Sequence, residues 1–134
     1  DHNKIVTIPT SRFVKLRRLT DLTIRNNKLM ALPDMHTMTN SLYIIADNNQ
    51  ISSFPQLGRN FRGLEIRNNL IRTLHPSYLD PTLQKFSQLY LDKNELQHIG
   101  DLGYGSPLTQ FHVGNDQVGF NPCLCEHAWL VGAR

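Results

Sequence analysis

Residues 19–29 read LTDLTIRNNKL and residues 61–71 read FRGLEIRNNLI, so the four letters IRNN recur 42 positions apart. The two segments also share the spacing of their apolar residues. An apolar residue falls eight, five and three places before the last Asn, and another falls two places after it. This shared frame around Asn27 and Asn69 predicts that the two segments are equivalent units of one repeating structure.

The same frame fits other parts of the chain when it is moved along the sequence. The fit around Asn49 is weak only at Ser41, and in the last copy Asp116 takes the place of the Asn. Asn3 begins the second half of one further copy. The successive anchors are spaced by 20–25 residues, and they are Asn3, Asn27, Asn49, Asn69, Asn94 and Asp116.

The centre of each frame predicts a short strand, because alternation sends Leu22 and Ile24 to one face and Thr23 and Arg25 to the other. One such strand cannot bury its apolar face alone, but a stack of equivalent strands forms a continuous core. The segments that return from one strand to the next should be irregular or contain short helical turns. In residues 9–16 we expect Phe13 and Leu16 to point inward.

The anchor residues predict a ladder of side-chain amides along the stack. An Asn that follows a strand can satisfy backbone groups of the turn with its own amide. The expected rungs of this Asn ladder are Asn27, Asn49, Asn69 and Asn94. Asp116 donates no hydrogen bond when it is ionised, so the last rung should be weaker.

The frame L-x-x-L-x-L-x-x-N-x-L, repeated every 20–25 residues, resembles that of leucine-rich-repeat proteins, and the resemblance covers essentially the whole chain. It implies an α/β repeat fold, a curved solenoid or horseshoe. Parallel strands would form its concave face, and irregular or short helical segments its convex face. Residues 1–120 would hold a partial first repeat and five further repeats.

The segment NPCLCEHAWL (121–130) resembles the start of the cysteine-rich C-terminal cap of extracellular leucine-rich-repeat proteins. Residues 121–134 would then begin this cap, and the resemblance implies that Cys123 and Cys125 pair with cysteines further along. One residue separates the two, which is too close for a bridge between them without severe strain. Cys123 departs from the family pattern by following Pro122 directly.

Two other interpretations of these cysteines stay open. They could be buried, unpaired thiols, or they could bind a metal together with His127, although C-x-C-x-H lacks the usual zinc spacing and a second half-site. We predict no metal site. Because neither end carries a complete cap, we expect the natural protein to be longer than these 134 residues.

Composition and motifs argue against several classes of function. With 40% hydrophobic and 19% charged residues, the chain is typical of a folded domain, and no apolar run is long enough to insert in a membrane. No nucleophile elbow, zinc-protease motif, P-loop or dinucleotide fingerprint occurs, so we expect neither an enzyme nor a cofactor. The net charge of +3 is modest, and we expect no nucleic-acid partner. Basic residues do gather near the N-terminal end, as a solvated rim or as a site for an acidic glycan or partner: Arg12, Lys15, Arg17, Arg18, Arg25 and Lys28.

The outward positions of the strands form three rows across the predicted sheet. The third place of the frame reads Asp21, Tyr43, Gly63, Gln88 and Gln110. The fifth place reads Thr23, Ile45, Glu65, Tyr90 and His112. The seventh place alternates in charge as Arg25, Asp47, Arg67 and Asp92, then ends in Gly114. This alternation fits either an internal set of salt bridges or a charged track for a partner.

Exposed aromatic and aliphatic side chains on a sheet face are typical of binding hot spots. We therefore predict a ligand-binding concave face made of Tyr43, Ile45, Glu65, Arg67, Tyr90 and His112. The expected function is non-catalytic recognition of a protein ligand or receptor, in the extracellular part of a secreted or cell-surface protein. Toll-type receptors, Slit-like proteins and variable lymphocyte receptors have this style of repeat and cap. The alternatives are a structural spacer, a dimerisation segment that would make a homodimer, and an intracellular leucine-rich-repeat scaffold.

Overall fold

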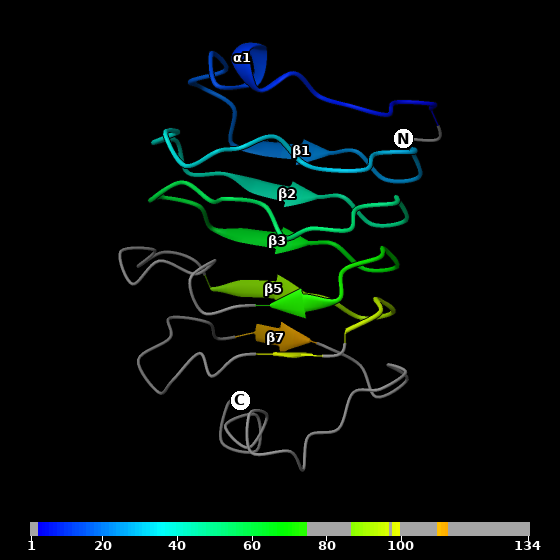
Figure 1. Ribbon diagram of the computed structural model, residues 1–134. Helices are drawn as coiled ribbons and strands as arrows, with labels where there is room; N and C mark the ends of the chain where they lie inside the picture. Colours follow the sequence, from blue (N-terminus) through cyan, green and yellow to red (C-terminus); the bar gives the residue numbers. More distant parts are fainter. Residues whose placement is uncertain (1–2, 75–86, 97, 100–109, 113–134) are drawn as a thin grey trace.

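The structure is a computed structural model that describes residues 3–74, 87–96, 98–99 and 110–112 (Figure 1). Its main feature is an all-parallel five-stranded sheet with the order β1-β2-β3-β5-β7. These strands are β1 (Asp21–Thr23), β2 (Tyr43–Ile45), β3 (Gly63–Glu65), β5 (Gln88–Tyr90) and β7 (Gln110–His112). Each of the five full copies of the sequence frame contributes one strand, and the strands lie in the order in which they occur in the chain. The predicted repeat of parallel strands is confirmed.

The register of the sheet follows the sequence frame without an offset. Its second apolar place forms one row across the sheet, Leu22, Ile44, Leu64, Leu89 and Phe111. Backbone hydrogen bonds continue the alignment beyond the strands, since the amide of Ile24 donates to the carbonyl of Ile45 (2.8 Å) and that of Ile66 to Tyr90 (3.0 Å). Adjacent repeats are therefore superimposed residue by residue.

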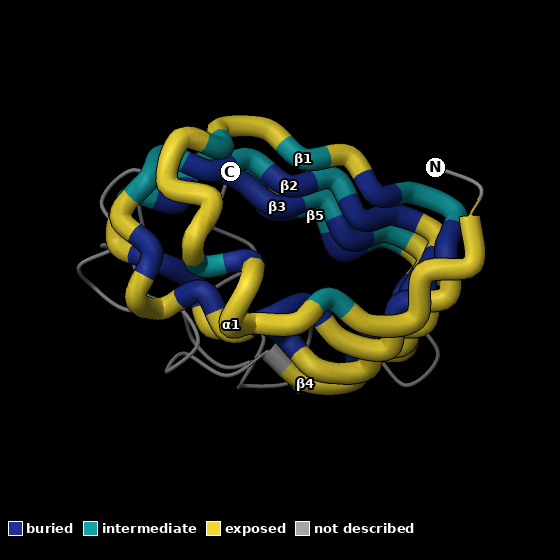
Figure 2. The backbone as a smooth tube through the Cα atoms, turned by 90° about the horizontal axis from the view of Figure 1, so that it is seen from above, coloured by how far each residue is buried: buried dark blue, intermediate teal, exposed yellow. Residues whose placement is uncertain are grey.

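The segments that return between the strands lie on the other side of the core. Seen along the stack, β1, β2, β3 and β5 line one side, while α1 (Thr10–Phe13) and β4 (Thr73–Leu74) lie on the opposite side (Figure 2). The single-turn helix α1 starts after Pro9. β4 pairs in parallel with β6 (His98–Ile99) in a separate two-stranded sheet. In the described residues the return segments are mostly irregular, as the sequence predicts.

The core lies between the sheet and the return segments, and two details of it differ from the sequence prediction. Phe13 is buried as expected, but Leu16 is 49% exposed, so its inward assignment was wrong. The chain turns tightly after Phe13, with the amide of Leu16 on the carbonyl of Phe13 (3.0 Å), and Val14 packs against the core instead. At the weak place in the second full frame, Leu42 next to Ser41 is buried and fills the core.

The Asn ladder repeats one pattern of hydrogen bonds from turn to turn. Asn69 donates through Nδ2 to the carbonyls of Ile66 (3.2 Å) and Arg67 (3.0 Å) at the end of its own strand. It also donates to Ala46 of the preceding repeat (3.1 Å), and its Oδ1 accepts from the amide of Ile51 (3.0 Å). Asn49 and Asn94 make the equivalent bonds. Asn27 donates to the carbonyls of Ile24 and Arg25 and accepts from the amide of Ile5. Each side chain closes its own turn and ties it to the repeat before.

The residue just before each rung adopts a left-handed conformation, with φ of 59° at Asn26, 60° at Asn48, 54° at Asn68 and 57° at Lys93. Asn tolerates this conformation better than other non-glycine residues. The three asparagines also bond to one another, because Nδ2 of Asn48 donates to Oδ1 of Asn26 (2.9 Å) and Nδ2 of Asn68 to Oδ1 of Asn48 (2.7 Å). In each NN pair the first Asn thus adopts the left-handed conformation of the turn, and the second forms a rung of the ladder. The sequence frame identified only the role of the second Asn.

Candidate recognition face

The sheet lies on one side of the core, with the return segments on the other (Figure 2), and strand residues such as Ile45 and Glu65 are partly exposed on its outer surface. We call this surface the open face, and its described side chains come from the three outward rows on β1, β2, β3 and β5. The register places Ile45 between Thr23 and Glu65, and Glu65 beside Tyr90. Of the predicted binding residues, five are brought together here, all of them half-buried: Tyr43, Ile45, Glu65, Arg67 and Tyr90. For the sixth, the backbone of His112 pairs with that of Tyr90.

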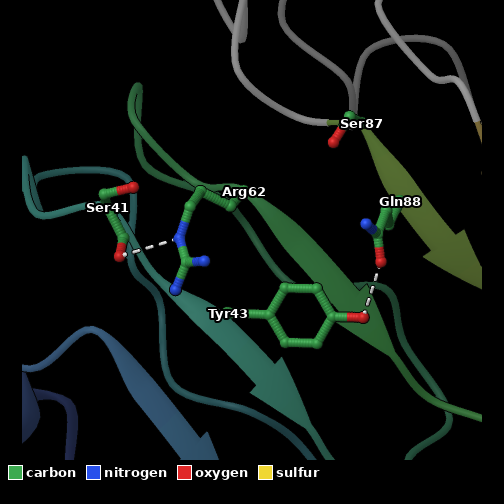
Figure 3. A pocket seen from close by; sticks show the side chains of 5 residues that line it. All are labelled: Ser41, Tyr43, Arg62, Ser87 and Gln88. Carbon is green, nitrogen blue, oxygen red and sulfur yellow. Dashed lines mark hydrogen bonds between the residues drawn. The ribbon is translucent and has the colours of Figure 1, made fainter.

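Tyr43 lies across the neighbouring strand because that strand has a glycine beneath it. A Cβ atom added at Gly63 would come within 2.5 Å of Cε2 of the Tyr43 ring. Without one, the ring spans β3 and its hydroxyl lies 2.9 Å from Oε1 of Gln88, two strands away (Figure 3). The same hydroxyl donates to Oε2 of Glu65 at 2.6 Å. Gly63 is therefore part of the open face because of the space that it leaves.

The surroundings of Tyr43 keep its hydroxyl protonated. Burial raises the pKa of the phenol, and the hydrogen bond to Glu65 and the negative charge of that carboxylate raise the pKa further. A hydroxyl that stays protonated at neutral pH can donate to the carboxylate and hold the ring in one orientation.

Arg67 is enclosed by acidic side chains and stacked on an aromatic ring. Its Nη1 lies 2.6 Å from Glu65 and 3.3 Å from Asp47, and its Nε lies 3.3 Å from Asp92. The guanidinium carbon is 4.3 Å from the centre of the Tyr90 ring, within the range of a cation–π contact. Burial works against the charged form, but the hydrogen bond to Glu65 and the charge of Asp47 outweigh it and raise the pKa of Arg67.

The four charged side chains of the seventh row form ion pairs with their neighbours in that row: Arg25, Asp47, Arg67 and Asp92. Arg25 and Arg67 both reach the carboxylate of Asp47, at 3.8 Å and 3.3 Å. Asp47 is 8% exposed and also accepts the backbone amide of Arg67 at 2.7 Å. These contacts form a set of salt bridges within the sheet, so Arg67 has little capacity left for a partner's charge.

Arg62 is a residue of the open face that the sequence analysis did not identify. It precedes β3, and its guanidinium carbon lies 5.7 Å from the centre of the Tyr43 ring. It borders a pocket of about 400 Å³ lined by Ser41, Tyr43, Arg62, Ser87 and Gln88 (Figure 3). The sequence did contain a signal, because the second place of the frame reads Thr20, Leu42, Arg62, Ser87 and Thr109 and holds a single charge.

Other predicted features lie apart from this face. Around α1, Arg12, Lys15, Arg17 and Arg18 are exposed and form no ion pair with any described residue. Cys123, Cys125 and His127 lie outside the described residues. Within the part that the structure describes, no group of three or more His, Cys, Asp or Glu side chains could hold a metal ion. No helix in that part is both long and apolar enough to span a bilayer.

No family model matches the sequence, and no curated protein matches it significantly.

Proposed function

We propose that this chain is a leucine-rich-repeat solenoid that recognises a protein partner through its open face, which would be the concave side of the horseshoe. Three features support the proposal. The sequence frame recurs with one strand per copy, the strands are parallel and in register, and the buried Asn ladder repeats the same bonds. A repeat of 20–29 residues with this frame is the signature of that family.

The main support for a recognition function is that the open face holds several half-exposed side chains fixed by their neighbours. Tyr43 is held by Glu65 and Gln88, and Tyr90 is held by Arg67. Ile45 is an aliphatic side chain in the same area. Aromatic side chains that are already ordered lose little conformational entropy on binding, which is one reason why they dominate interface energetics.

The proposed activity is recognition without catalysis, because the ionisable groups at the centre of the face form ion pairs with one another. We propose a secreted or cell-surface location on the resemblance of residues 121–134 to an extracellular cap. Alkylation of Cys123 and Cys125 in the full-length protein, with and without reductant, tests this location. Thiols that react only after reduction support it, and thiols that react freely favour an intracellular scaffold.

Site-specific photocrosslinking tests the recognition function without knowledge of the partner. A benzophenone amino acid placed at Ile45 should crosslink a partner in the protein's native surroundings. The matched control is Ser53, which is exposed on a return segment. Crosslinks from position 45 and none from position 53 support the proposal. No crosslink from position 45, or equal yields from both positions, would favour the spacer, and crosslinks between two copies of the chain would favour the homodimer.

A further inference from the structure

Arg62 differs from Arg67 in how its charge is used. Both guanidinium groups lie against a tyrosine ring, but Arg67 contacts three carboxylates, whereas Arg62 contacts a single carboxylate among the described residues, that of Asp21. The side chain of Asp21 is 70% exposed. An exposed ion pair of this kind contributes little to stability and is readily exchanged.

The guanidinium of Arg62 is held in place by backbone groups rather than by its ion pair. Its Nη2 donates to the carbonyl of Thr20 at 2.9 Å, and its Nε lies 3.4 Å from the carbonyl of Ser41. The side chain is thereby fixed across the neighbouring repeats, with Tyr43 on one side (Figure 3). A cation that is already oriented loses less entropy when it binds an anion.

The hydrogen-bond donors of Arg62 are only partly used. A guanidinium has five N–H donors, and those of Nη1 have no acceptor among the described residues. Asp21 accepts from Nη2 through one oxygen at 3.1 Å. The structure itself thus shows that a carboxylate can reach this guanidinium, while donors remain for a second one.

We propose that the pocket beside Arg62 binds the carboxylate of an Asp or Glu side chain on the protein partner. The incoming carboxylate takes the Nη1 donors of Arg62 and competes with Asp21 for the charge of the guanidinium. Ser41 and Ser87 line the same pocket. Glu65 does not line this pocket, and its two oxygens are bonded to Tyr43 and Arg67. This inference rests on the proposed function and adds the chemistry of the partner.

Titration of the isotope-labelled chain with a small probe tests the pocket directly. The probe is N-acetyl-glutamate N-methylamide, and its glutamine counterpart is the neutral control. We expect saturable NMR shifts at the Arg62 side-chain Nε–H and at the Ser41 and Ser87 amides with the glutamate probe, and no such shifts with the glutamine probe. Inorganic sulfate serves as a second anion, and we expect it to bind more weakly than the carboxylate.

Three variants connect the response to the structure. Arg62→Gln should abolish the shifts, and Asp21→Asn should strengthen binding several-fold because it removes the competing carboxylate. Arg59→Gln is the matched control, because Arg59 is exposed and does not line the pocket. Its response should equal that of the wild type.

Equal responses to the two probes, tighter binding of sulfate than of the carboxylate, or weaker binding by Asp21→Asn would each overturn the inference. The outcome can be separated from that of the proposed function. If position 45 crosslinks a partner but the glutamate probe does not bind, only the inference about the pocket is wrong. If the probe binds but no partner is crosslinked, the carboxylate site stands and the proposed function fails.

Discussion

Single side chains at the end of each strand connect the repeats to one another. Each rung of the Asn ladder combines a donor and an acceptor in one short amide, and no other side chain of that length carries this group. At Asn69 four backbone groups from two repeats depend on this amide. Loss of a rung therefore leaves several buried polar groups without partners.

Asn69→Ala should lower the free energy of unfolding by about 3 kcal/mol, because it leaves the buried amide of Ile51 unsatisfied together with the carbonyls. Asn69→Asp should be similarly destabilised at neutral pH, since an ionised carboxylate accepts but cannot donate, and should recover partly as the pH falls. Urea unfolding followed by circular dichroism measures both. An Ala variant within the error of the wild type would show that the ladder is not what stabilises the turns.

Lys93 is the exception among the left-handed residues, and replacing it should stabilise the protein. At φ of 57° a lysine is strained, whereas an asparagine is better tolerated. Lys93→Asn should therefore raise the free energy of unfolding by about 0.5–1 kcal/mol. Lys93→Ala removes the charge but keeps the strain, so this control should give no gain. Equal gains from the two variants would point to the charge instead.

Because of Tyr43, the stability of the protein should fall at alkaline pH. Because burial and Glu65 raise the folded-state pKa of the phenol, its contribution to stability is complete below the unfolded-state pKa of about 10 and is lost as the pH rises above it. The urea midpoint of the wild type should fall more steeply between about pH 9 and 11 than that of Tyr43→Phe. Parallel curves for the two proteins would contradict the assigned environment of Tyr43.

At the residue scale, the sequence predicts the contacts that recur in every repeat and misses the contacts that occur only once. The rungs follow from the frame, since every copy needs the same bonds. Leu16 and Arg62 do not, because the first depends on one local turn and the second on hydrogen bonds to two particular backbone carbonyls. The crossing of Tyr43 over Gly63 is likewise a contact between two particular side chains.

Among the described elements, Gly58 and Gly63 lie where neighbouring groups leave no room for a side chain. A Cβ atom at Gly58 would clash with the carbonyl oxygens of Met35 and Met38, so two return segments pack there backbone to backbone. On the sheet, Gly63 leaves room for Tyr43 of β2 to cross β3 and form a hydrogen bond with Gln88 of β5. The sequence frame includes Gly63 but not Gly58, and it gives no reason for either glycine.

Gly63→Ala should displace the Tyr43 ring and break its bond to Gln88, at a cost of about 1–3 kcal/mol. The same substitution in a Tyr43→Ala background should cost much less, because the ring that it meets is gone. Urea unfolding of the four proteins in this double-mutant cycle measures the coupling. Additive effects would show that the two residues do not interact.

On the scale of the whole molecule, one repeated unit produces two different surfaces. The apolar places of the frame stack into the core, and the outward places stack into the rows of the open face. The architecture was predictable because a periodic sequence has a periodic structure. The partner was not, since recognition depends on which outward residues keep free capacity once the internal pairs have formed.

The central claim is that the open face binds a protein, and the most direct test is the affinity of the full-length protein for the partner captured by crosslinking. Tyr90→Ala and Ile45→Ser should each weaken that affinity about tenfold, because both remove half-exposed apolar groups from the centre of the face. Their unfolding midpoints should stay close to that of the wild type, and Arg72→Ala, on an exposed return segment, should change neither quantity. Unchanged affinity in both Tyr90→Ala and Ile45→Ser would contradict the account, because partner binding would then take place elsewhere on the molecule.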